Sequence, residues 1–330
     1  MKEILNQLFQ QQTLTREESK RVLIKLANGE YNATQMAAFL TVFQLRNITL
    51  TELQGFRDAM LELCISIDFS DFNTVDLCGT GGDNKDTFNI STLAAFVVAG
   101  AGEKVVKHGN YGVSSVCGSS NILEYFGYNF SNSKDKLEKE LDTAGICFLH
   151  APLFNPAMKN IAPIRKELAI KTFFNMLGPM VNPASPQNQL IGVYNAELAR
   201  MYNYIYQLSG KNYCIVHSLD GYDEISLTGG FQIQSANSNS ILSPSDLGLK
   251  ELNPVELKGG VTIKESVEIF LNILKGNGSE AQNNVVIANA GYALQCIYFE
   301  KSIKQCLEKA KLSLKSGKAL QSFNKIVRNK

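Results

Sequence analysis

Several kinds of residue and motif are scarce in this sequence, and their scarcity excludes whole classes of protein. There is no tryptophan among the 330 residues, and there are only three histidines and seven cysteines. The cysteines form no CxxC pair and the histidines no HExxH motif, which argues against a disulfide framework and against a zinc site. Uncharged apolar runs all fall short of the roughly 18 residues that a membrane span needs.

Neither sign of charge dominates the chain. It carries 32 basic and 31 acidic side chains, a formal net charge of +1. Such a chain has no overall field to attract nucleic acid or an acidic membrane, so any anion must be held by a local site. The N-terminal stretch MKEILNQLFQQQ is amphipathic and too polar for a signal peptide, and we expect a cytoplasmic protein.

The N-terminal part of the sequence predicts helices only. Thr15 with Glu18, and Thr49 with Glu52, have the spacing of capping boxes that open helices. Residues 32–45 are apolar on all sides, which predicts a helix that is buried or covered by a second subunit. We therefore predict a small helical domain over residues 1–72.

The pattern changes after residue 72 to strands, glycine-rich loops and helices in alternation. Strands are predicted at 75–78, 104–106, 146–149 and 213–216, with a helix from about Ser91. This alternation predicts an α/β domain over 73–330, with a mostly parallel central sheet flanked by helices. The Pro- and Asn-rich segment 154–186 interrupts the alternation, and part of it is expected to rejoin the helical domain.

Two motifs offer backbone N–H groups to an anion. The first is GTGGD at 79–83, where missing Cβ atoms let an anion approach the main chain, although a simple tight turn is the alternative. The second is NIST at 89–92, at a helix start. It is either a plain N-cap or a phosphate seat, and the Ser91 hydroxyl could also ligate Mg²⁺.

Three further groups offer charge. Lys107, at a strand end within KHGN, suits a polyphosphate, whereas the adjacent His108 is either structural or functional. Arg165 is either a solvated helix residue or a fork for a carboxylate. Asp223 and Glu224 are either solvated or Mg²⁺ ligands. Since no apolar pocket is evident that would raise their pKa, we expect metal binding from this pair and no proton transfer.

These motifs occur in an order that resembles the anthranilate phosphoribosyltransferase family over nearly the whole chain. The order is GTGGD, TFNIST, KHGN with GVSS, APIRKEL, FNMLGP and DGYDEISLTG. The resemblance implies a helical domain joined to an α/β domain, a homodimer through the helical domain, and two Mg²⁺ ions per active site. It also implies transfer of the phosphoribosyl group of 5-phosphoribosyl 1-pyrophosphate to the amine of anthranilate, in tryptophan biosynthesis.

The resemblance assigns site residues as follows. The residues for phosphoribosyl pyrophosphate are Gly79, Gly82, Asp83, Thr87, Asn89, Ile90, Ser91, Thr92, Lys107, Ser115 and Ser119. Those for anthranilate are Gly79, His108, Asn110 and Arg165, and those for the metal are Ser91, Asp223 and Glu224. The sequence departs from the family pattern at Tyr111, Ser120, Asn121, Asn155, Ala169 and Lys171, where the family usually shows Arg, Ala, Asp, His, Gly and Arg.

The implied chemistry needs no protein nucleophile or strong base. An aromatic amine is neutral at pH 7, and the difficult step is departure of pyrophosphate, whose growing charge Mg²⁺, Lys107 and the loop N–H groups would stabilise. We therefore expect no covalent intermediate. Two alternatives stay open from sequence: a pyrimidine-nucleoside phosphorylase of the same fold, and a non-catalytic relative that binds nucleic acid.

Overall fold

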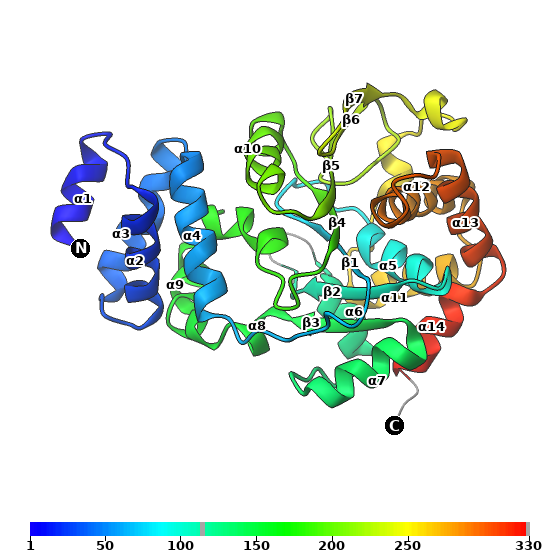
Figure 1. The fold of residues 1–330 in the computed structure, drawn as a ribbon, viewed down its shortest axis with the longest axis horizontal. Helices are drawn as coiled ribbons and strands as arrows, with labels where there is room; N and C mark the ends of the chain where they lie inside the picture. The colour runs from blue at the N-terminus through cyan, green and yellow to red at the C-terminus, as the bar shows by residue number, and fades with distance from the viewer. Residues whose placement is uncertain (113–115, 328–330) are drawn as a thin grey trace. The chain divides into compact units, whose positions relative to one another are not determined.

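The computed structural model describes residues 1–112 and 116–327, which form two compact units (Figure 1). The first unit comprises Met1–Ile67 and Ala151–Pro183, and the second Asp68–His150 and Ala184–Lys330. Residues 68–72, which the sequence placed with the helical domain, belong to the second unit. Within the described residues, no helix is both long and apolar enough to cross a bilayer.

The first unit is entirely helical. Its main helices are α1 (Lys2–Phe9), α2 (Arg16–Ala27), α3 (Ala33–Leu45) and α4 (Leu50–Leu63), and its later segment forms α8 (Ala151–Phe154), η1 (Pro156–Asn160), α9 (Ala162–Leu168), η2 (Phe173–Met176) and η3 (Gly178–Met180). Both predicted capping boxes are confirmed, with Thr15 opening α2 and Thr49 opening α4.

The core of this unit is built around phenylalanines from both of its chain segments. Phe173 of η2 stacks on Phe56 of α4 with ring centroids 4.2 Å apart, and meets Phe39 and Phe43 of α3 edge-on. The largest side chains of α3 are therefore buried within the single chain. Leu45, at the end of α3, stays 78% exposed.

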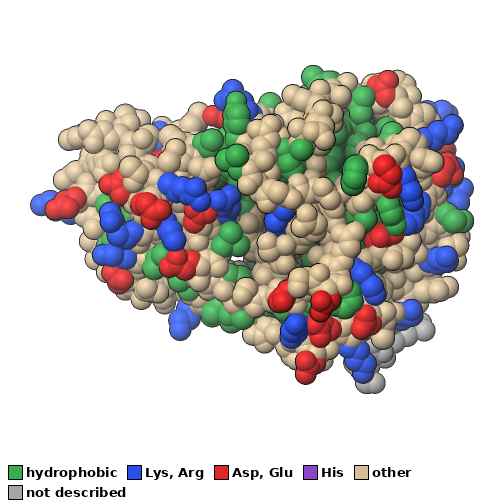
Figure 2. Space-filling model, viewed as in Figure 1, with side chains coloured by type: hydrophobic (Ala, Val, Ile, Leu, Met, Phe, Trp, Pro, Cys, Tyr) green, Lys and Arg blue, Asp and Glu red, His purple; other side chains and the backbone are tan. Residues whose placement is uncertain are grey.

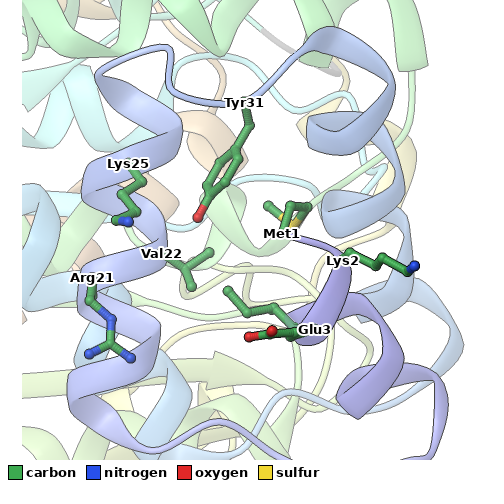
Figure 3. A pocket seen from close by; sticks show the side chains of 8 residues that line it. Met1, Lys2, Glu3, Arg21, Val22, Lys25 and Tyr31 are labelled. Carbon is green, nitrogen blue, oxygen red and sulfur yellow. The ribbon is translucent and has the colours of Figure 1, made fainter.

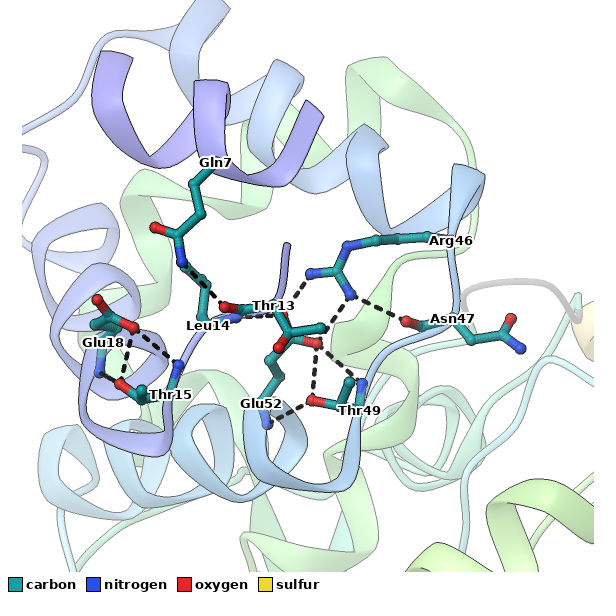
Figure 4. A network of polar contacts seen from close by, with 9 residues as sticks. All are labelled: Gln7, Thr13, Leu14, Thr15, Glu18, Arg46, Asn47, Thr49 and Glu52. Atoms are coloured by element: carbon teal, nitrogen blue, oxygen red, sulfur yellow. Dashed lines mark hydrogen bonds and ion pairs between the residues drawn. The ribbon is translucent and has the colours of Figure 1, made fainter. Parts of the chain in front are cut away.

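A buried carboxylate joins three segments of the helical unit (Figure 4). Glu52 is fully buried, accepts the N–H groups of Leu14 (3.0 Å) and Thr49 (2.9 Å), and pairs with Arg46. Burial alone would raise the pKa of Glu52, but the Arg46 and main-chain hydrogen bonds outweigh it and lower that pKa. The bonds of Glu52 link the residue before α2, the residue after α3 and the cap of α4, although among the described residues the buried Nε of Arg46 has no hydrogen-bond partner.

The second unit contains one seven-stranded sheet. Its strands are β1 (Thr74–Gly79), β2 (Lys104–Gly109), β3 (Ile146–His150), β4 (Asn188–Gly192), β5 (Asn212–Ser218), β6 (Phe231–Gln234) and β7 (Asn239–Leu242). The spatial order is β3-β2-β1-β4-β5-β6-β7, with β1 to β5 parallel and the last two pairings antiparallel. The predicted fold class is thus confirmed, although the sequence analysis did not identify β4.

Helices cover this sheet. They are α5 (Ile90–Gly100), α6 (Ser119–Tyr125), α7 (Lys134–Ala144), α10 (Ala196–Gln207), α11 (Ile263–Leu274), α12 (Glu280–Ile297), α13 (Ile303–Lys315) and α14 (Lys318–Val327), with short 3₁₀ turns η4 (Pro244–Leu247) and η5 (Pro254–Leu257). Helices α5 and α12 pack on the middle strands, α7 on β3 and α10 on β5.

The carboxyl ends of the parallel strands lie at one edge of the sheet, where α/β proteins bind ligands. In the register, Gly79 at the end of β1 lies beside Gly192 at the end of β4. Two neighbouring strands thus end without a side chain at the same point.

Candidate active site

The glycine-rich loop 79–83 and the loop 219–230, which we call the acid loop, meet at this edge. The N–H of Gly81 donates to Oδ2 of Asp223 at 2.7 Å. A Cβ at Gly79 would lie 2.2 Å from that same oxygen, and a Cβ at Gly192 only 1.6 Å from the carbonyl oxygen of Asp223. Asp223 can therefore occupy this position only because both strands end in glycine.

The adjacent carboxylate reaches the second predicted anion site. Oε1 of Glu224 accepts the N–H of Ser91, in the first turn of α5, at 3.0 Å, where the helix dipole favours negative charge. Asn89 makes no side-chain cap, and its side-chain N–H donates to the carbonyl of Cys117 at 2.8 Å. The acid loop thus holds main-chain donors of both GTGGD and NIST.

The acidic side chains form one electrostatic cluster. Burial, and then the charge of Asp83, raise the pKa of Asp223 to about 7. Burial and the charge of Asp223 raise the pKa of Glu224, and burial raises that of Asp83. The expectation that nothing raises these pKa values is therefore wrong, because the pocket forms only when the two loops close over the glycines.

This cluster suits a divalent cation. Its donors are hard carboxylate oxygens, and a cation beside them would relieve the mutual repulsion that raises their pKa values. Among the described residues, no three His, Cys, Asp or Glu side chains are arranged to hold an ion by themselves. Mg²⁺ bound with substrate phosphates needs only one or two protein carboxylates, so Asp223 and Glu224 fit an ion shared with a substrate.

Lys107 belongs to the same cluster. The sequence placed it at a strand end, but β2 continues to Gly109, so Lys107 lies within the strand and is buried. Its Nζ donates to the carbonyl of Leu77 at 2.7 Å, and its charge counteracts the rise in the pKa of Glu224. His108 beside it is buried, and its main-chain N–H donates to Asp76 at 3.2 Å.

The loop after β2 is tied to the start of α6. The carbonyl of Asn110 accepts the Ser119 hydroxyl at 3.3 Å and the Ser120 N–H at 3.2 Å. A Cβ at Gly109 would lie 2.3 Å from the Ser119 hydroxyl oxygen, so this glycine is required for the close approach. The side chain of Asn110 is exposed, and Ser115 lies outside the described residues.

The remaining residues predicted for phosphoribosyl pyrophosphate flank these loops. Gly82 is buried in a left-handed conformation (φ +77°), and Thr87 pairs with Lys258 in an isolated bridge. Ile90 and Thr92 are buried in the first turn of α5, where Ile90 belongs to the hydrophobic core. The main-chain groups of Ile90 are thus its candidates for ligand contact, whereas Thr92 also has a hydroxyl group.

Arg165 lies in the helical unit, in α9. Its guanidinium carbon is 4.9 Å from the ring centroid of Phe174, and burial lowers its pKa. In the described part of the chain no carboxylate lies within ion-pair distance of it. A half-buried guanidinium without an acidic partner keeps its N–H donors for an anion, which favours the carboxylate fork over the solvated alternative. Its role toward anthranilate stays a prediction.

Ala169 follows α9 at a position where the family usually has glycine, and its backbone conformation accounts for that preference. Its φ is +52°, in the left-handed region that glycine adopts freely. We expect Ala169→Gly to raise the free energy of unfolding by up to about 1 kcal/mol, because relief of left-handed strain (about 1–2 kcal/mol) exceeds the added chain entropy (about 0.5–1 kcal/mol). Thermal unfolding should show a Tm about 2 °C higher, and an unchanged or lower Tm would contradict the strain.

Two residues that shape the site were not predicted from the sequence. Gly192 belongs to β4, which was not identified. Asn289 of α12 is buried and makes two hydrogen bonds to the main chain of Ile225, the residue after the two acids. Its Oδ1 accepts the Ile225 N–H at 3.0 Å, and its Nδ2 donates to the Ile225 carbonyl at 2.9 Å. A single amide within the apolar run VVIANAGYAL was a signal that could have indicated it.

Two cavities elsewhere in the protein contain none of the predicted site residues. One of about 420 Å³ lies between α1 and α2, and Figure 3 shows both basic (Lys2, Arg21, Lys25) and acidic (Glu3) side chains in its lining, together with Tyr31. Another of about 430 Å³ lies beside α12 and α13. On the face drawn in Figure 2, basic and acidic side chains are interspersed, without the single-sign stripe typical of a nucleic-acid surface.

Comparisons with known proteins identify the family to which the chain belongs. The family model described as "Glycosyl transferase family, a/b domain" matches residues 71–320, and that described as the family's helical bundle domain matches residues 2–64. Anthranilate phosphoribosyltransferase of Flavobacterium johnsoniae is 61% identical over 99% of this chain and 98% of its own length. That of Bacteroides thetaiotaomicron is 50% identical over 99% and 98%.

Solved structures give the same result. The enzyme of Thermus thermophilus has a TM-score of 0.89 at 31% identity, covering 98% of both chains. The Saccharomyces cerevisiae enzyme in complex with PRPP and Mg has a TM-score of 0.88 at 26% identity, covering 98% of this chain and 96% of that one. With two family models in their expected order and full-length relatives of one activity, the chain belongs to the anthranilate phosphoribosyltransferase family of glycosyl transferases.

Proposed function

We propose that this chain transfers the 5-phosphoribosyl group of phosphoribosyl pyrophosphate to the amine of anthranilate at the carboxyl edge of its sheet, releasing pyrophosphate. The observation that carries this placement is the pair of bonds from Gly81 to Asp223 and from Ser91 to Glu224, which joins both anion loops to the acid loop. Anthranilate fluorescence should decay when phosphoribosyl pyrophosphate and Mg²⁺ are added. No decay at saturating substrate would contradict the proposal.

The chain's residues act by holding and orienting the substrates. N–H groups of the glycine-rich loop and of the first turn of α5 bind phosphate oxygens, and Lys107 adds a fixed positive charge nearby. In the helical unit we assign Arg165 to the anthranilate carboxylate, and in the α/β unit we assign Gly79, His108 and Asn110 to anthranilate binding. The neutral amine needs only to be kept close to the reacting carbon, so no residue has to take its proton beforehand.

The metal ligands are Ser91, Asp223 and Glu224. When bound, Mg²⁺ neutralises charge that gathers on the pyrophosphate oxygens. We assign one ion to Ser91 and a second to Asp223 with Glu224. The support is the chemistry of these donors and the clustering of acids whose repulsion a cation would relieve.

We expect Arg165→Ala to raise KM for anthranilate by about 10- to 150-fold, because a charge-assisted pair contributes about 1.5–3 kcal/mol. KM for phosphoribosyl pyrophosphate should change little. Steady-state kinetics with each substrate varied in turn measures both, and Lys166→Ala, an exposed lysine on the same helix, is the matched control. An unchanged KM for anthranilate would remove Arg165 from the site.

We also propose that the chain is a homodimer through its helical unit and works in the cytoplasm. In that unit Phe9 is 59% exposed and Leu45 78% exposed. Light scattering at micromolar concentration should show a dimer, and a Phe9→Asp, Leu45→Asp variant a monomer. Leu208→Asp, at an equally exposed leucine of the α/β unit (85%), should stay dimeric. A wild-type monomer would contradict the proposal, and cell fractionation checks the compartment.

A further inference from the structure

Phe174 lies against the guanidinium of Arg165 and is not among the predicted site residues. The ring is 7% exposed, with its centroid 4.9 Å from the guanidinium carbon. The two residues come from different elements, α9 and η2, on either side of the left-handed Ala169. The turn of the chain between α9 and η2 thus gives Arg165 an aromatic partner in place of an acidic one.

Phe174 is itself held firmly. Its ring stacks on Phe173 with centroids 4.7 Å apart and planes 26° from parallel, and Phe173 stacks in turn on Phe56 at 4.2 Å and 16°. Phe39 and Phe43 close the edges of Phe173. The position of Phe174 is therefore set by α3 and α4, whose ends the bonds of Glu52 link.

An aromatic partner differs from an acidic one in how many N–H donors and how much charge of the guanidinium stay available to a substrate. A carboxylate would hold the guanidinium by its N–H donors and neutralise its charge, whereas a ring attracts it through the π face and takes none of the strong hydrogen bonds. The charge and the planar fork of Arg165 then stay available to an incoming carboxylate.

We propose that Phe174 is a positioning residue that holds Arg165 for the substrate carboxylate and so contributes to selectivity for carboxylate-bearing aromatic amines. The proposal rests on the role of Arg165 given under the proposed function. It requires that the effect of Phe174 on anthranilate passes through Arg165. A residue that only fills the core would act on stability and on both substrates alike.

A double-mutant cycle tests this requirement. Phe174→Leu keeps the apolar bulk and removes the π face, and it should raise KM for anthranilate about 3- to 30-fold, the range that loss of a cation–π contact gives. KM for phosphoribosyl pyrophosphate and kcat should change little. In an Arg165→Ala background, Phe174→Leu should have no further effect. Phe174→Tyr keeps the ring and should restore a nearly normal KM.

A control variant separates an effect on the position of Arg165 from an effect on stability. Val22→Ala, at a buried residue of α2 outside the phenylalanine stack, should lower the Tm while leaving KM for anthranilate unchanged. Phe174→Met serves in place of Phe174→Leu if the latter does not fold. Equal effects of Phe174→Leu with and without Arg165 would overturn the proposal, as would an unchanged KM for anthranilate in Phe174→Leu. If Arg165→Ala alone left KM for anthranilate unchanged, the assignment of Arg165 to the substrate carboxylate would be wrong. The proposed role of Phe174, which depends on that assignment, would then be wrong as well.

Discussion

The Asp223→Asn, Glu224→Gln double variant should need far more Mg²⁺ than the wild type and, at limiting Mg²⁺, lose about 10²- to 10³-fold in kcat/KM, the usual cost of losing electrostatic stabilisation of a charged transition state. Each substitution keeps an oxygen that can accept the N–H of Gly81 or Ser91, so the loops should stay closed. What the variant loses is the negative charge that attracts the cation. Asp220→Asn, at an exposed acid of the same loop, is the matched control and should leave the Mg²⁺ midpoint unchanged.

The pH dependence of that midpoint distinguishes metal binding from proton transfer. Burial raises the pKa of Asp223 to about 7 in the absence of metal, so Asp223 takes up a proton as the pH falls through neutrality. A bound proton competes with Mg²⁺, and the wild-type midpoint should therefore rise as the pH is lowered from about 8 to 6, whereas the variant's should stay flat. Saturating Mg²⁺ should remove the wild-type dependence. A pH limb that persists at saturating Mg²⁺ and vanishes in the variant would mean that these acids transfer protons.

Gly192→Ala should destabilise the protein by about 3 kcal/mol or more, the upper range for forcing atoms into a packed site. Its Cβ would lie 1.6 Å from the carbonyl oxygen and 2.7 Å from the carbonyl carbon of Asp223, both main-chain atoms that no rotamer change can move. The acid loop has to shift, so the Tm should fall by about 6 °C or more. The Mg²⁺ midpoint should rise as well, because Asp223 moves with the loop.

Gly229→Ala is the control for that substitution. Gly229 is also in the acid loop, its φ is not in the left-handed region, and a Cβ there would meet nothing within 4 Å. Thermal unfolding and Mg²⁺ titration of both variants should show a large effect at Gly192 and almost none at Gly229. Equal Tm values for Gly192→Ala and the wild type would show that β4 does not constrain the acid loop.

The elements that could be predicted from sequence are those whose signals are local. Thr15 and Thr49 open their helices by bonds within four residues of chain, and GTGGD follows an apolar strand directly. The fold class and the order of the motifs could be predicted from such local signals alone. Strand β4 was missed because its run is short, NQLIG, and follows the irregular segment that ends at Pro183.

The electrostatics of the site could not be predicted, because they depend on contacts between residues far apart in sequence. Asp223 meets Gly81 across 142 positions and Glu224 meets Ser91 across 133. In sequence, two adjacent acids in a polar loop look solvated. Only the missing side chains at Gly79 and Gly192, one of them in the missed strand, let the pair sink into the edge of the sheet and acquire raised pKa values.

The bonds from Gly81 and Ser91 to the acid loop have a thermodynamic consequence. Two main-chain donors of the kind that a phosphate would use are satisfied by the protein's own carboxylates. These internal anions keep the two loops in order, but a phosphate that takes the same donors has to displace them. A cation that draws the carboxylates toward itself releases the donors, so metal and phosphate each lower the free-energy cost of binding the other. By linkage this cooperativity is reciprocal. Phosphoribosyl pyrophosphate should tighten the binding of Mg²⁺ by the same factor by which Mg²⁺ tightens the binding of phosphoribosyl pyrophosphate.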